Sequence, residues 1–414
     1  MPRTHHVIVG ASIAGVSAAV AMRENGFDGT ITLVDAQRQL PYERPALSKA
    51  ADPEKAVRPI LPEGHYAQHD LDLVLGARVR RLDDDRRRVV LDGGDDLPAD
   101  RVLLTTGAFC RRLGVPGEGL ADVHSLRTAD DARRVFTSLE RGGPLVVVGG
   151  GFIGLEAAAV ARTMGVEVTV VEAGHLPLRG PLGPSVARLM TRLHQEHGVH
   201  VLAEQGVRSF LGSGSVEEVV LTEGRRLPAA AVIVGIGVAA DDRIAREVGA
   251  TCENGVVVDS HGRTDHPWLW SAGDVASHIH PAVGTRARIE HWDVAMRHGA
   301  AVGASMAGRP TVNTAVPYFW TDQYGKSLQM FGRTRPQDRV VLREGATPER
   351  FLAFWLREDR VVAVAGLDEA KAVRAARALV ESGAPVPADV LADPSTDLRA
   401  LSRGAARQAL SFPA

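Results

Sequence analysis

The apolar positions of this chain fall into short runs, separated by glycine-rich turns and alanine-rich stretches. Residues 145–148 form a β-branched apolar run, which predicts a strand buried on both faces. Glycines follow this run, and the alanines of 157–161 then favour a helix. A second apolar run covers 166–171. The order strand, helix, strand predicts a parallel βαβ unit.

The same pattern occurs near the start of the chain. An apolar run at 6–9 precedes a glycine-containing turn and a helical stretch, and a second run lies at 31–34. Each copy is followed later by a strand that runs into a glycine, within 102–108 and within 232–238. Two copies of one supersecondary pattern predict an internal duplication.

The segments outside the two copies show other patterns, typical of antiparallel strands and linkers. Short alternating runs with a turn at 92–94 predict a β-meander within 72–106. The glycines and prolines of 114–120, and the glycines of 235–242, are typical of linkers. We therefore expect the second copy to be inserted into the domain that contains the first.

The composition changes from Thr311 onward. Aromatic residues concentrate in 316–332, although they make up only 5% of the chain. Alternating runs then predict strands at 339–342, 351–357 and 361–367, and a helix is expected over 369–382. The predicted fold class is therefore α/β, with two Rossmann-like nucleotide-binding domains, the first split by the second, and a C-terminal α+β domain. The expected bounds are 1–111 with 239–312, then 112–238, then 313–414.

Glycine spacing indicates what the second copy binds. Gly149, Gly151 and Gly154 have the spacing G-x-G-x-x-G, and Glu172 ends the following strand. The first glycine permits a tight turn, the second lets backbone approach a pyrophosphate, and the third lets helix pack on strand. The helix N-terminus offers N–H groups to phosphates, and the acid suits an adenosine ribose. This combination predicts a dinucleotide site.

The first copy carries a close variant of this pattern. Gly10 and Gly15 are present and Asp35 ends the second strand, but Ser12 replaces the middle glycine. A serine hydroxyl can itself donate to a phosphate. Two dinucleotide sites in one chain favour hydride transfer between a nicotinamide and a flavin.

Overall composition narrows the class of protein. The net charge of −2 gives no reason to expect nucleic acid or an anionic membrane as a partner. The apolar run 229–240 is too short to span a bilayer, and a strand beginning at His6 leaves no room for a signal peptide. Cys110 and Cys252 are far apart and are expected to be buried apolar groups. We expect a cytoplasmic protein.

Two histidines raise the question of a metal site. His278 and His280 flank a single residue, but no further ligand is spaced with them. A solvated His-x-His is the simpler interpretation, and we predict no metal site.

Lysine is rare, with 4 among the 48 lysines and arginines. Each lysine is therefore a candidate for a specific role. Tyr42, Arg44 and Lys49 lie in a proline-containing segment after the first copy, which is either a solvated loop or a flavin contact. Asp274 follows a predicted strand and either caps a helix or binds a polyol chain.

Six short motifs, in this order along the chain, resemble one family. They are PYERPALSK (41–49), LLTTGA (103–108), GGGFIGLE (149–156), SAGD (271–274), EHWDVA (290–295) and PYFWTDQYG (317–325). The family is that of FAD-dependent NADH:ferredoxin reductases, putidaredoxin reductase-like proteins of the glutathione-reductase-like superfamily. These serve ring-hydroxylating dioxygenases and bacterial haem monooxygenases.

The resemblance implies a cofactor for each domain. FAD would bind the split domain and NAD the inserted one. Gly10, Ser12, Gly15 and Asp35 would hold the FAD pyrophosphate and ribose, Asp274 the ribityl chain, and Trp292 and Trp320 would pack near the ring. The remaining implied FAD residues are Arg44, Lys49, Thr106, Gly107 and Glu290. The implied NAD residues are Gly149, Gly151, Gly154, Glu156, Glu172 and Gly237.

Two residues are implied to act in catalysis. Lys49 would lie near the hydride-accepting edge of the flavin, and Glu156 would face the nicotinamide and pair with Lys49. Such an ion pair would help offset charge that develops on the reduced ring. Glu172 should repel a 2′-phosphate and favour NADH over NADPH, a preference that Arg179 could soften.

Segment 37–50 contains no cysteine, unlike the related disulphide reductases and NADH oxidases. This disfavours peroxide-, coenzyme A disulphide- and water-forming oxidase activities. The resemblance therefore implies electron transfer from NADH through FAD to a [2Fe–2S] ferredoxin that supplies an oxygenase, by a monomer or weak dimer. Arg309, Arg333 and Arg335 could steer an acidic ferredoxin. The alternatives are rubredoxin or a quinone as acceptor, or a non-catalytic flavin-binding signalling protein of the apoptosis-inducing-factor type.

Overall fold

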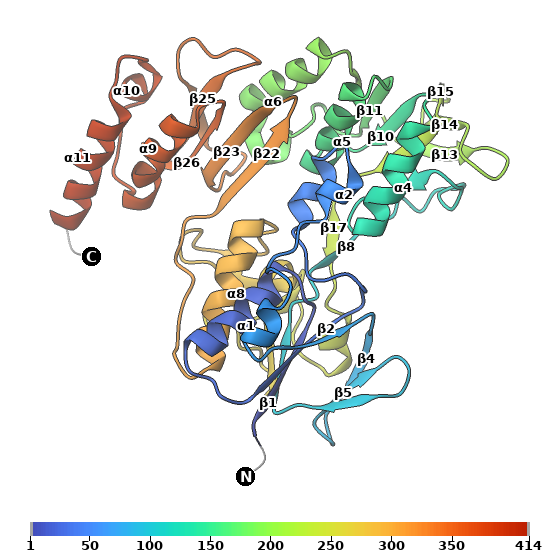
Figure 1. Cartoon of the computed structure of the whole chain (residues 1–414). Coiled ribbons are helices and arrows are strands. Elements are labelled where there is room, and N and C mark those ends of the chain that lie inside the picture. The colour runs from blue at the N-terminus through green and yellow to red at the C-terminus, as the bar shows by residue number, and fades with distance from the viewer. Residues whose placement is uncertain (1–2, 412–414) are drawn as a thin grey trace. The chain divides into compact units, whose positions relative to one another are not determined.

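The computed structural model describes residues 3–411, and its chain divides into two compact units (Figure 1). Unit 1 contains residues 3–44, 57–109 and 238–315. Unit 2 contains Pro45–Ala56, Cys110–Gly237 and 316–411. The short segment Pro45–Ala56 thus belongs to unit 2, although its neighbours in the sequence belong to unit 1.

A five-stranded parallel sheet forms the centre of unit 1, with the order β19-β7-β1-β2-β3. Its strands are β1 (His5–Val9), β2 (Thr30–Asp35), β3 (Asp72–Leu75), β7 (Arg101–Leu104) and β19 (Leu269–Ser271). The apolar residues of β1, such as Val7 and Ile8, are fully buried, as expected for a strand covered on both faces.

Helices α1 (Ile13–Glu24) and α8 (Trp292–Met306) lie side by side in unit 1 (Figure 1). Glycine makes their close approach possible. A Cβ on Gly299 would lie 2.2 Å from the Ala14 carbonyl oxygen, and one on Gly303 would lie 2.2 Å from that of Ala18. This contact fixes α1 against α8, which lies in segment 238–315, the part of the chain that returns to unit 1.

Unit 2 contains a second five-stranded parallel sheet, with the order β12-β11-β10-β16-β9. Its strands are β9 (Val123–His124), β10 (Leu145–Val148), β11 (Val168–Glu172), β12 (His200–Ala203) and β16 (Ala231–Val234). Its helices are α4 (Ala129–Glu140), α5 (Phe152–Thr163) and α6 (Arg179–Glu196). Four strands correspond in chain order and in sheet position, β1, β2, β3 and β7 to β10, β11, β12 and β16, which confirms the predicted duplication. The fifth strand differs, because β19 comes last along the chain in its sheet and β9 comes first in its own.

Each copy also carries a three-stranded antiparallel sheet. In unit 1 it is formed by β4 (Val79–Asp83), β5 (Arg88–Leu91) and β6 (Asp96–Pro98), where a meander was predicted. In unit 2 it is formed by β13 (Val207–Leu211), β14 (Glu218–Leu221) and β15 (Arg226–Pro228), which the sequence analysis did not identify.

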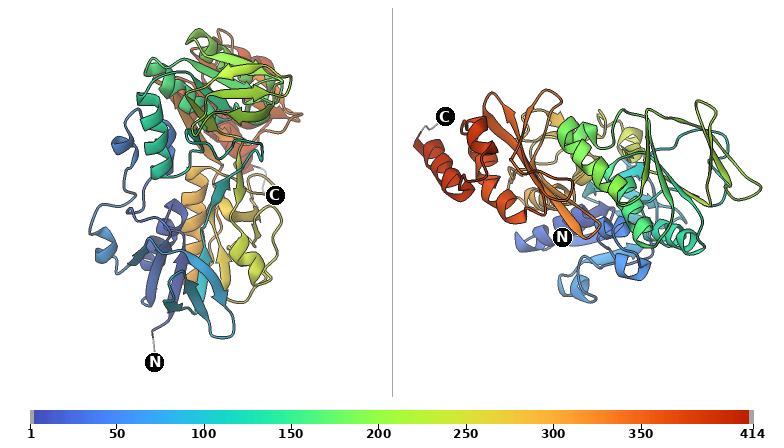
Figure 2. Two further views of the ribbon diagram at one scale, coloured as in Figure 1. Left: turned by 90° about the vertical axis from the view of Figure 1, so that its right-hand side faces the viewer. Right: turned by 90° about the horizontal axis from the view of Figure 1, so that it is seen from above.

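The C-terminal part of unit 2 is a five-stranded antiparallel sheet with helices along one side (Figure 2). Its order is β22 (Tyr318–Gln323), β23 (Lys326–Gly332), β26 (Arg360–Leu367), β25 (Phe351–Arg357) and β24 (Arg339–Leu342). The predicted helix is α9 (Ala370–Ser382), which contacts β23, β26 and α11 (Leu398–Ser411). Helix α11 and the short α10 (Ala388–Ala392) were not predicted.

The remaining elements are short. They are η1 (Arg44–Ser48), α2 (Pro53–Ala56), α3 (His65–Gln68), β8 (Ala108–Cys110), β17 (Val238–Ala240), α7 (Arg243–Glu247), β18 (Val256–Val257), η2 (Gly273–Val275), β20 (Ala276–Ile279) and β21 (Arg286–Ala287). Among residues 3–411, no helix combines the length and the apolar character needed to cross a membrane. The predicted fold class is confirmed by the two parallel sheets and the C-terminal antiparallel sheet with its helices.

Candidate functional site

The turn after β1 can be built only with glycine at two positions. Gly10 has φ +107°, and a Cβ there would lie 2.4 Å from the Thr105 carbonyl oxygen. A Cβ on Gly15 would lie 2.1 Å from the Gly10 carbonyl oxygen. Since real Cβ atoms do not approach this closely, both glycines serve the turn and the packing of α1 onto the sheet.

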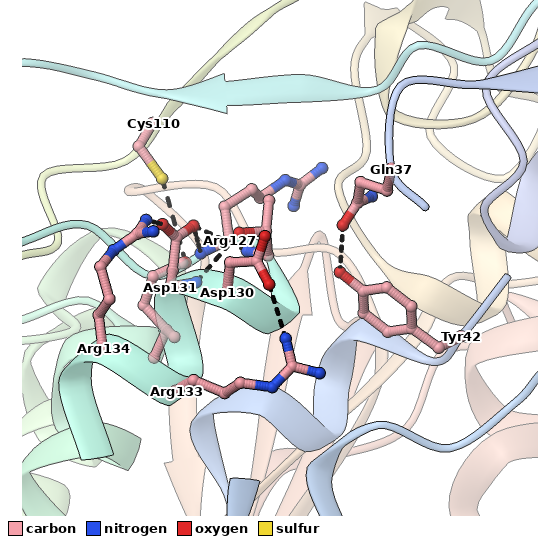
Figure 3. Close-up of polar contacts among 10 residues, drawn as sticks. Gln37, Tyr42, Cys110, Arg127, Asp130, Asp131, Arg133 and Arg134 are labelled. Atoms are coloured by element: carbon pink, nitrogen blue, oxygen red, sulfur yellow. Dashed lines mark hydrogen bonds and ion pairs between the residues drawn. The ribbon is translucent and has the colours of Figure 1, made fainter. Parts of the chain in front are cut away.

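Asp35, at the end of β2, is held by backbone N–H groups. Its Oδ2 accepts from the Ala11 N–H at 2.8 Å, and its Oδ1 accepts from the Gln37 N–H at 2.8 Å. A small pocket lies against this turn, and the Tyr42 hydroxyl beside it donates to Gln37 Oε1 at 2.6 Å (Figure 3). The pocket is lined by Ala11, Ser12, Asp35, Gln37, Gln39, Leu40, Pro41, Tyr42 and Arg44. Three of the residues implied to bind FAD, Ser12, Asp35 and Arg44, therefore share one pocket.

The substitution at Ser12 does not alter the turn. Ser12 has φ −97° and ψ −170°, and Gly151, its counterpart in unit 2, has φ −79° and ψ 175°. Both lie in the extended region, which any residue adopts. The Ser12 hydroxyl makes no capping hydrogen bond to α1. A serine therefore fits this position and presents a donor at the start of the helix.

The turn after β10 repeats this geometry in unit 2. Gly149 has φ +104°, and a Cβ there would lie 2.4 Å from the Gly235 carbonyl oxygen. A Cβ on Gly154 would lie 2.4 Å from the Gly149 carbonyl oxygen. Glu172 Oε2 accepts from the Gly150 N–H at 2.7 Å, and its Oε1 accepts from the Gly174 N–H at 2.6 Å. The acid at the end of the second strand is thus fixed in the same way in both copies.

These two turns fit a dinucleotide on the chemistry of their donors. Each ends at a helix N-terminus, α1 or α5, whose first N–H groups have no partner within the helix. Each also holds a carboxylate, Asp35 or Glu172, beside the turn. Phosphate oxygens accept hydrogen bonds, and ribose hydroxyls donate to carboxylates, so the residues present suit both parts of an adenine dinucleotide.

Glu156, on α5, is a buried carboxylate with three donors around it. Its side chain is 4% exposed, and Lys49 Nζ lies 2.6 Å from its Oε1. The Thr321 hydroxyl donates to the same oxygen at 2.5 Å, and the Ser48 hydroxyl donates to Oε2. All four residues belong to unit 2. The ion pair implied by the resemblance is therefore present, and Ser48 and Thr321 are partners that the sequence analysis missed.

Three predicted residues lie where the chain passes along the paired strands β8 and β17. The Thr106 hydroxyl donates to the Asp241 carbonyl oxygen at 2.6 Å, and the Gly107 carbonyl oxygen accepts from the Asp241 N–H at 3.0 Å. In unit 2, the Gly237 carbonyl oxygen accepts from the Arg111 N–H at 3.0 Å. Each of these contacts lies within one unit.

Asp274, Glu290 and Trp292 lie close together in the sequence of unit 1. The Asp274 backbone oxygen accepts from Arg288 Nη1 at 2.9 Å, and Arg288 Nη2 lies 2.5 Å from Glu290 Oε1. Trp292 is the first residue of α8. Trp320 lies on β22 in unit 2, with its ring 5.9 Å from that of Tyr318.

The predicted solvation of His278 and His280 is wrong. Their residues are 5% and 0% exposed, and the His278 ring lies 4.3 Å from that of His298 on α8, which is 2% exposed. Burial lowers the pKa of His278 to about 4, with His280 and Arg286 adding to the shift. Burial also holds the pKa of His298 well below its usual value. Within residues 3–411, no three His, Cys, Asp or Glu side chains come together as a metal-holding group.

The two cysteines are free thiols and are only half-buried, not buried as predicted. Burial raises the pKa of Cys110 and raises that of Cys252 to about 11. Both thiols are therefore protonated near neutral pH and are poor nucleophiles.

Two family models match the chain. The model described as pyridine nucleotide-disulphide oxidoreductase matches residues 4–299, and the model described as reductase C-terminal matches residues 318–402. Together they cover both parallel sheets and the C-terminal antiparallel sheet.

Two curated relatives match over nearly their whole lengths. Rhodocoxin reductase of Rhodococcus erythropolis is 36% identical over 397 residues, which cover 95% of this chain and 93% of the relative. The ferredoxin reductase component of chlorobenzene dioxygenase from a Cupriavidus species (strain PS12) is 36% identical over 402 residues, covering 97% and 98%.

Solved structures agree with these relatives. The covalent putidaredoxin reductase–putidaredoxin complex contains a chain that superposes with a TM-score of 0.93 at 31% identity, covering 98% of this chain and 99% of that one. The ferredoxin reductase for the CYP199A2 system from Rhodopseudomonas palustris gives a TM-score of 0.92 at 30% identity, covering 96% and 99%.

Proposed function

Because the chain belongs to the pyridine nucleotide-disulphide oxidoreductase family, we propose that it is an NADH-dependent ferredoxin reductase. It passes electrons from NADH through FAD to a [2Fe–2S] ferredoxin, which supplies an oxygenase. The observation that carries this function is the pair of equivalent turns, each with an essential glycine and a fixed acid, in a chain that lacks a cysteine in segment 37–50. The named relatives support the same function.

FAD, when bound, accepts two electrons together as hydride and gives them up one at a time. The protein contributes binding and orientation. Gly10, Ser12, Gly15 and Asp35 would hold the pyrophosphate and ribose from the turn after β1. The other residues proposed to hold FAD are Arg44, Lys49, Thr106, Gly107, Asp274, Glu290, Trp292 and Trp320.

NADH would bind the equivalent turn in unit 2. Gly149, Gly151 and Gly154 would receive the pyrophosphate, Glu172 the adenosine ribose, and Gly237 would lie beside them. Glu172 disfavours a 2′-phosphate because of its charge, which supports NADH over NADPH. Glu156 and its partner Lys49 would orient the nicotinamide. Because hydride transfer needs no acid or base, this orientation is the main contribution of the protein to catalysis.

The proposed domains are 1–111 with 239–312 for FAD, 112–238 for NADH, and 313–414 for the C-terminal α+β domain. Arg309 of unit 1, and Arg333 and Arg335 of unit 2, are each exposed, as residues that steer an acidic ferredoxin must be. We place the protein in the cytoplasm, where NADH and its ferredoxin would be available.

Three measurements test this function. The purified protein should carry FAD, its flavin absorbance should bleach rapidly with NADH in the absence of oxygen, and a [2Fe–2S] ferredoxin should link NADH oxidation to cytochrome c reduction. Electron transfer to rubredoxin or a quinone but to no ferredoxin would overturn the acceptor. Slow bleaching into a long-lived charge-transfer complex would instead favour a signalling protein of the apoptosis-inducing-factor type.

A further inference from the structure

The buried carboxylate of Glu156 is the end of a longer chain of hydrogen bonds in unit 2. The Thr321 hydroxyl contacts Glu156 Oε1 at 2.5 Å, and Gln323 Nε2 donates to the Thr321 hydroxyl oxygen at 3.0 Å. Gln323 Oε1 lies 2.7 Å from His194 Nε2, and the Tyr324 hydroxyl lies 2.8 Å from His194 Nδ1. Five side chains from α5, α6, β22 and the residue that follows β22 are thus connected.

In this series of hydrogen bonds, the groups at the two ends decide which partner donates and which accepts in each bond. Glu156 pairs with Lys49, and an ionised carboxylate only accepts, so the Thr321 O–H must donate to it. Because the single hydroxyl proton of Thr321 is already donated to Glu156, the Thr321 oxygen accepts from the Gln323 amide. The Gln323 carbonyl oxygen therefore accepts from His194 Nε2–H.

The remaining contact completes the same direction. Burial lowers the pKa of His194 to about 4, so the ring is neutral and carries one proton. With that proton on Nε2, Nδ1 accepts from the Tyr324 O–H, and burial raises the pKa of Tyr324, which keeps this hydroxyl protonated. All four donors thus point toward Glu156, and hydrogen bonds aligned in this way polarise one another.

Burial and ring packing hold these hydrogen-bonded side chains in place. His194, Thr321 and Gln323 are 0%, 1% and 2% exposed, so water does not compete for their hydrogen bonds. The Tyr324 ring stacks on His197 at 3.8 Å, which holds the outer end. The Phe319 ring packs against Phe152, the first residue of α5, at 4.8 Å, which fixes β22 beside the helix that carries Glu156.

We propose that Thr321, Gln323, His194 and Tyr324 are positioning residues that hold the Glu156 carboxylate in one orientation for the nicotinamide of NADH. This inference rests on the proposed function, because it assigns Glu156 to the nicotinamide. It extends the site from α5 to the C-terminal sheet, and it gives β22 a part in aiming NADH. None of the four residues touches the reacting atoms in this role.

Thr321→Val tests the proposal, because it removes the donor to Glu156 and keeps the shape of the side chain. In the flavin-loaded protein, we expect flavin reduction at saturating NADH to slow about tenfold, the effect of one hydrogen bond to a charged group, with little change in the NADH dissociation constant. Thr321→Ser, which keeps the hydroxyl, should restore the wild-type rate of flavin reduction.

Thr191→Val is the matched control. Like Thr321, Thr191 is a buried threonine, but it lies on α6, and its hydroxyl oxygen has no hydrogen-bond partner in the described part of the chain. The flavin of this variant should be reduced by NADH at the wild-type rate. A Thr321→Val protein that behaves like this control would overturn the proposal, whereas wild-type protein that NADH does not reduce would instead overturn the proposed function.

Tyr324→Phe keeps the proposal testable if Thr321→Val does not accumulate with flavin bound. It removes only the hydroxyl at the outer end of the chain. We expect flavin reduction at saturating NADH to slow about threefold, with little change in the NADH dissociation constant. A wild-type rate in Tyr324→Phe would overturn the proposal in that case.

Discussion

Lys49 Nζ lies 2.6 Å from Glu156 Oε1, and this ion pair joins residues that are 107 positions apart in the sequence. Both side chains are largely buried, at 15% and 4% exposed. A buried carboxylate that loses its cation is costly, so each partner depends on the other for stability as well as for any role in catalysis.

Replacing Lys49 with methionine should therefore destabilise the protein. We expect a loss of about 3 kcal/mol in the free energy of unfolding, because Glu156 stays buried without its cation. Urea unfolding of the flavin-loaded protein measures this. The control is Lys55→Met, which removes a lysine that is 79% exposed in its pair with Asp52 and should change stability by less than about 1 kcal/mol. Equal stability of the two variants would contradict the prediction.

Replacing Glu172 with arginine should change the choice of nucleotide. The carboxylate repels a 2′-phosphate and an arginine attracts it, so the ratio of kcat/KM for NADH to that for NADPH should fall at least about tenfold. Glu172→Gln separates charge from structure, since its amide oxygen can keep one of the two backbone contacts to Gly150 and Gly174. An unchanged ratio in Glu172→Arg would refute the ribose assignment.

Two of the three glycines in the G-x-G-x-x-G pattern of unit 2 should differ in their tolerance of a side chain. Gly149→Ala places a Cβ 2.4 Å from a backbone oxygen at a positive φ, and should cost about 1–3 kcal/mol of stability and weaken NADH binding. At Gly151 the nearest atom to a Cβ is 3.8 Å away, so Gly151→Ser should change stability by no more than about 0.5 kcal/mol. Thermal unfolding and NADH titration compare the pair, and a serine variant as damaged as the alanine variant would count against this account.

His278 should make the protein less stable in acid. Its pKa is lowered to about 4 in the folded state, so below about pH 6.5 the unfolded chain takes up the proton that the folded chain refuses. Stability due to this group is full above pH 6.5 and is lost as the pH falls toward 4. Charges on His280 and Arg286 contribute to this lowered pKa, and the His298 ring packs against His278 at 4.3 Å.

The variant His278→Leu tests this dependence. The loss of unfolding free energy between pH 7.5 and pH 5 should be smaller than in the wild type by about 2 kcal/mol. His200→Leu, at an exposed histidine on β12, should leave the loss unchanged. The same loss in all three proteins would show that His278 does not control acid sensitivity.

The parallel sheets and their glycine turns could be predicted from sequence because their physical causes are local. An apolar run, a glycine at a positive φ and an acid at a strand end all lie within about thirty residues of one another, as in Gly10 and Asp35. The second three-stranded sheet, β13 to β15, was missed although the duplication itself implied it.

Contacts that depend on the tertiary fold could not be predicted in the same way. Thr321 meets Glu156 across 165 positions, and no periodicity of the sequence marks it. His278 and His280 have the composition of a polar loop, but His278 lies on β20 and His280 directly follows it, and both are buried, with the His278 ring against His298 of α8. Burial of a polar residue is decided by what packs over it, and here the covering helix begins more than ten residues later in the chain.

The membership of Pro45–Ala56 in unit 2 limits how the protein can be dissected. A fragment made only from residues 110–237 and 316–411 would omit Ser48 and Lys49 and would leave Glu156 buried with Thr321 as its one remaining donor. It would also expose the face of α4 that α2 contacts. A nicotinamide-binding module cut from this chain, or transplanted into another reductase, therefore needs this twelve-residue segment supplied in cis by a redesigned connection or in trans as a peptide.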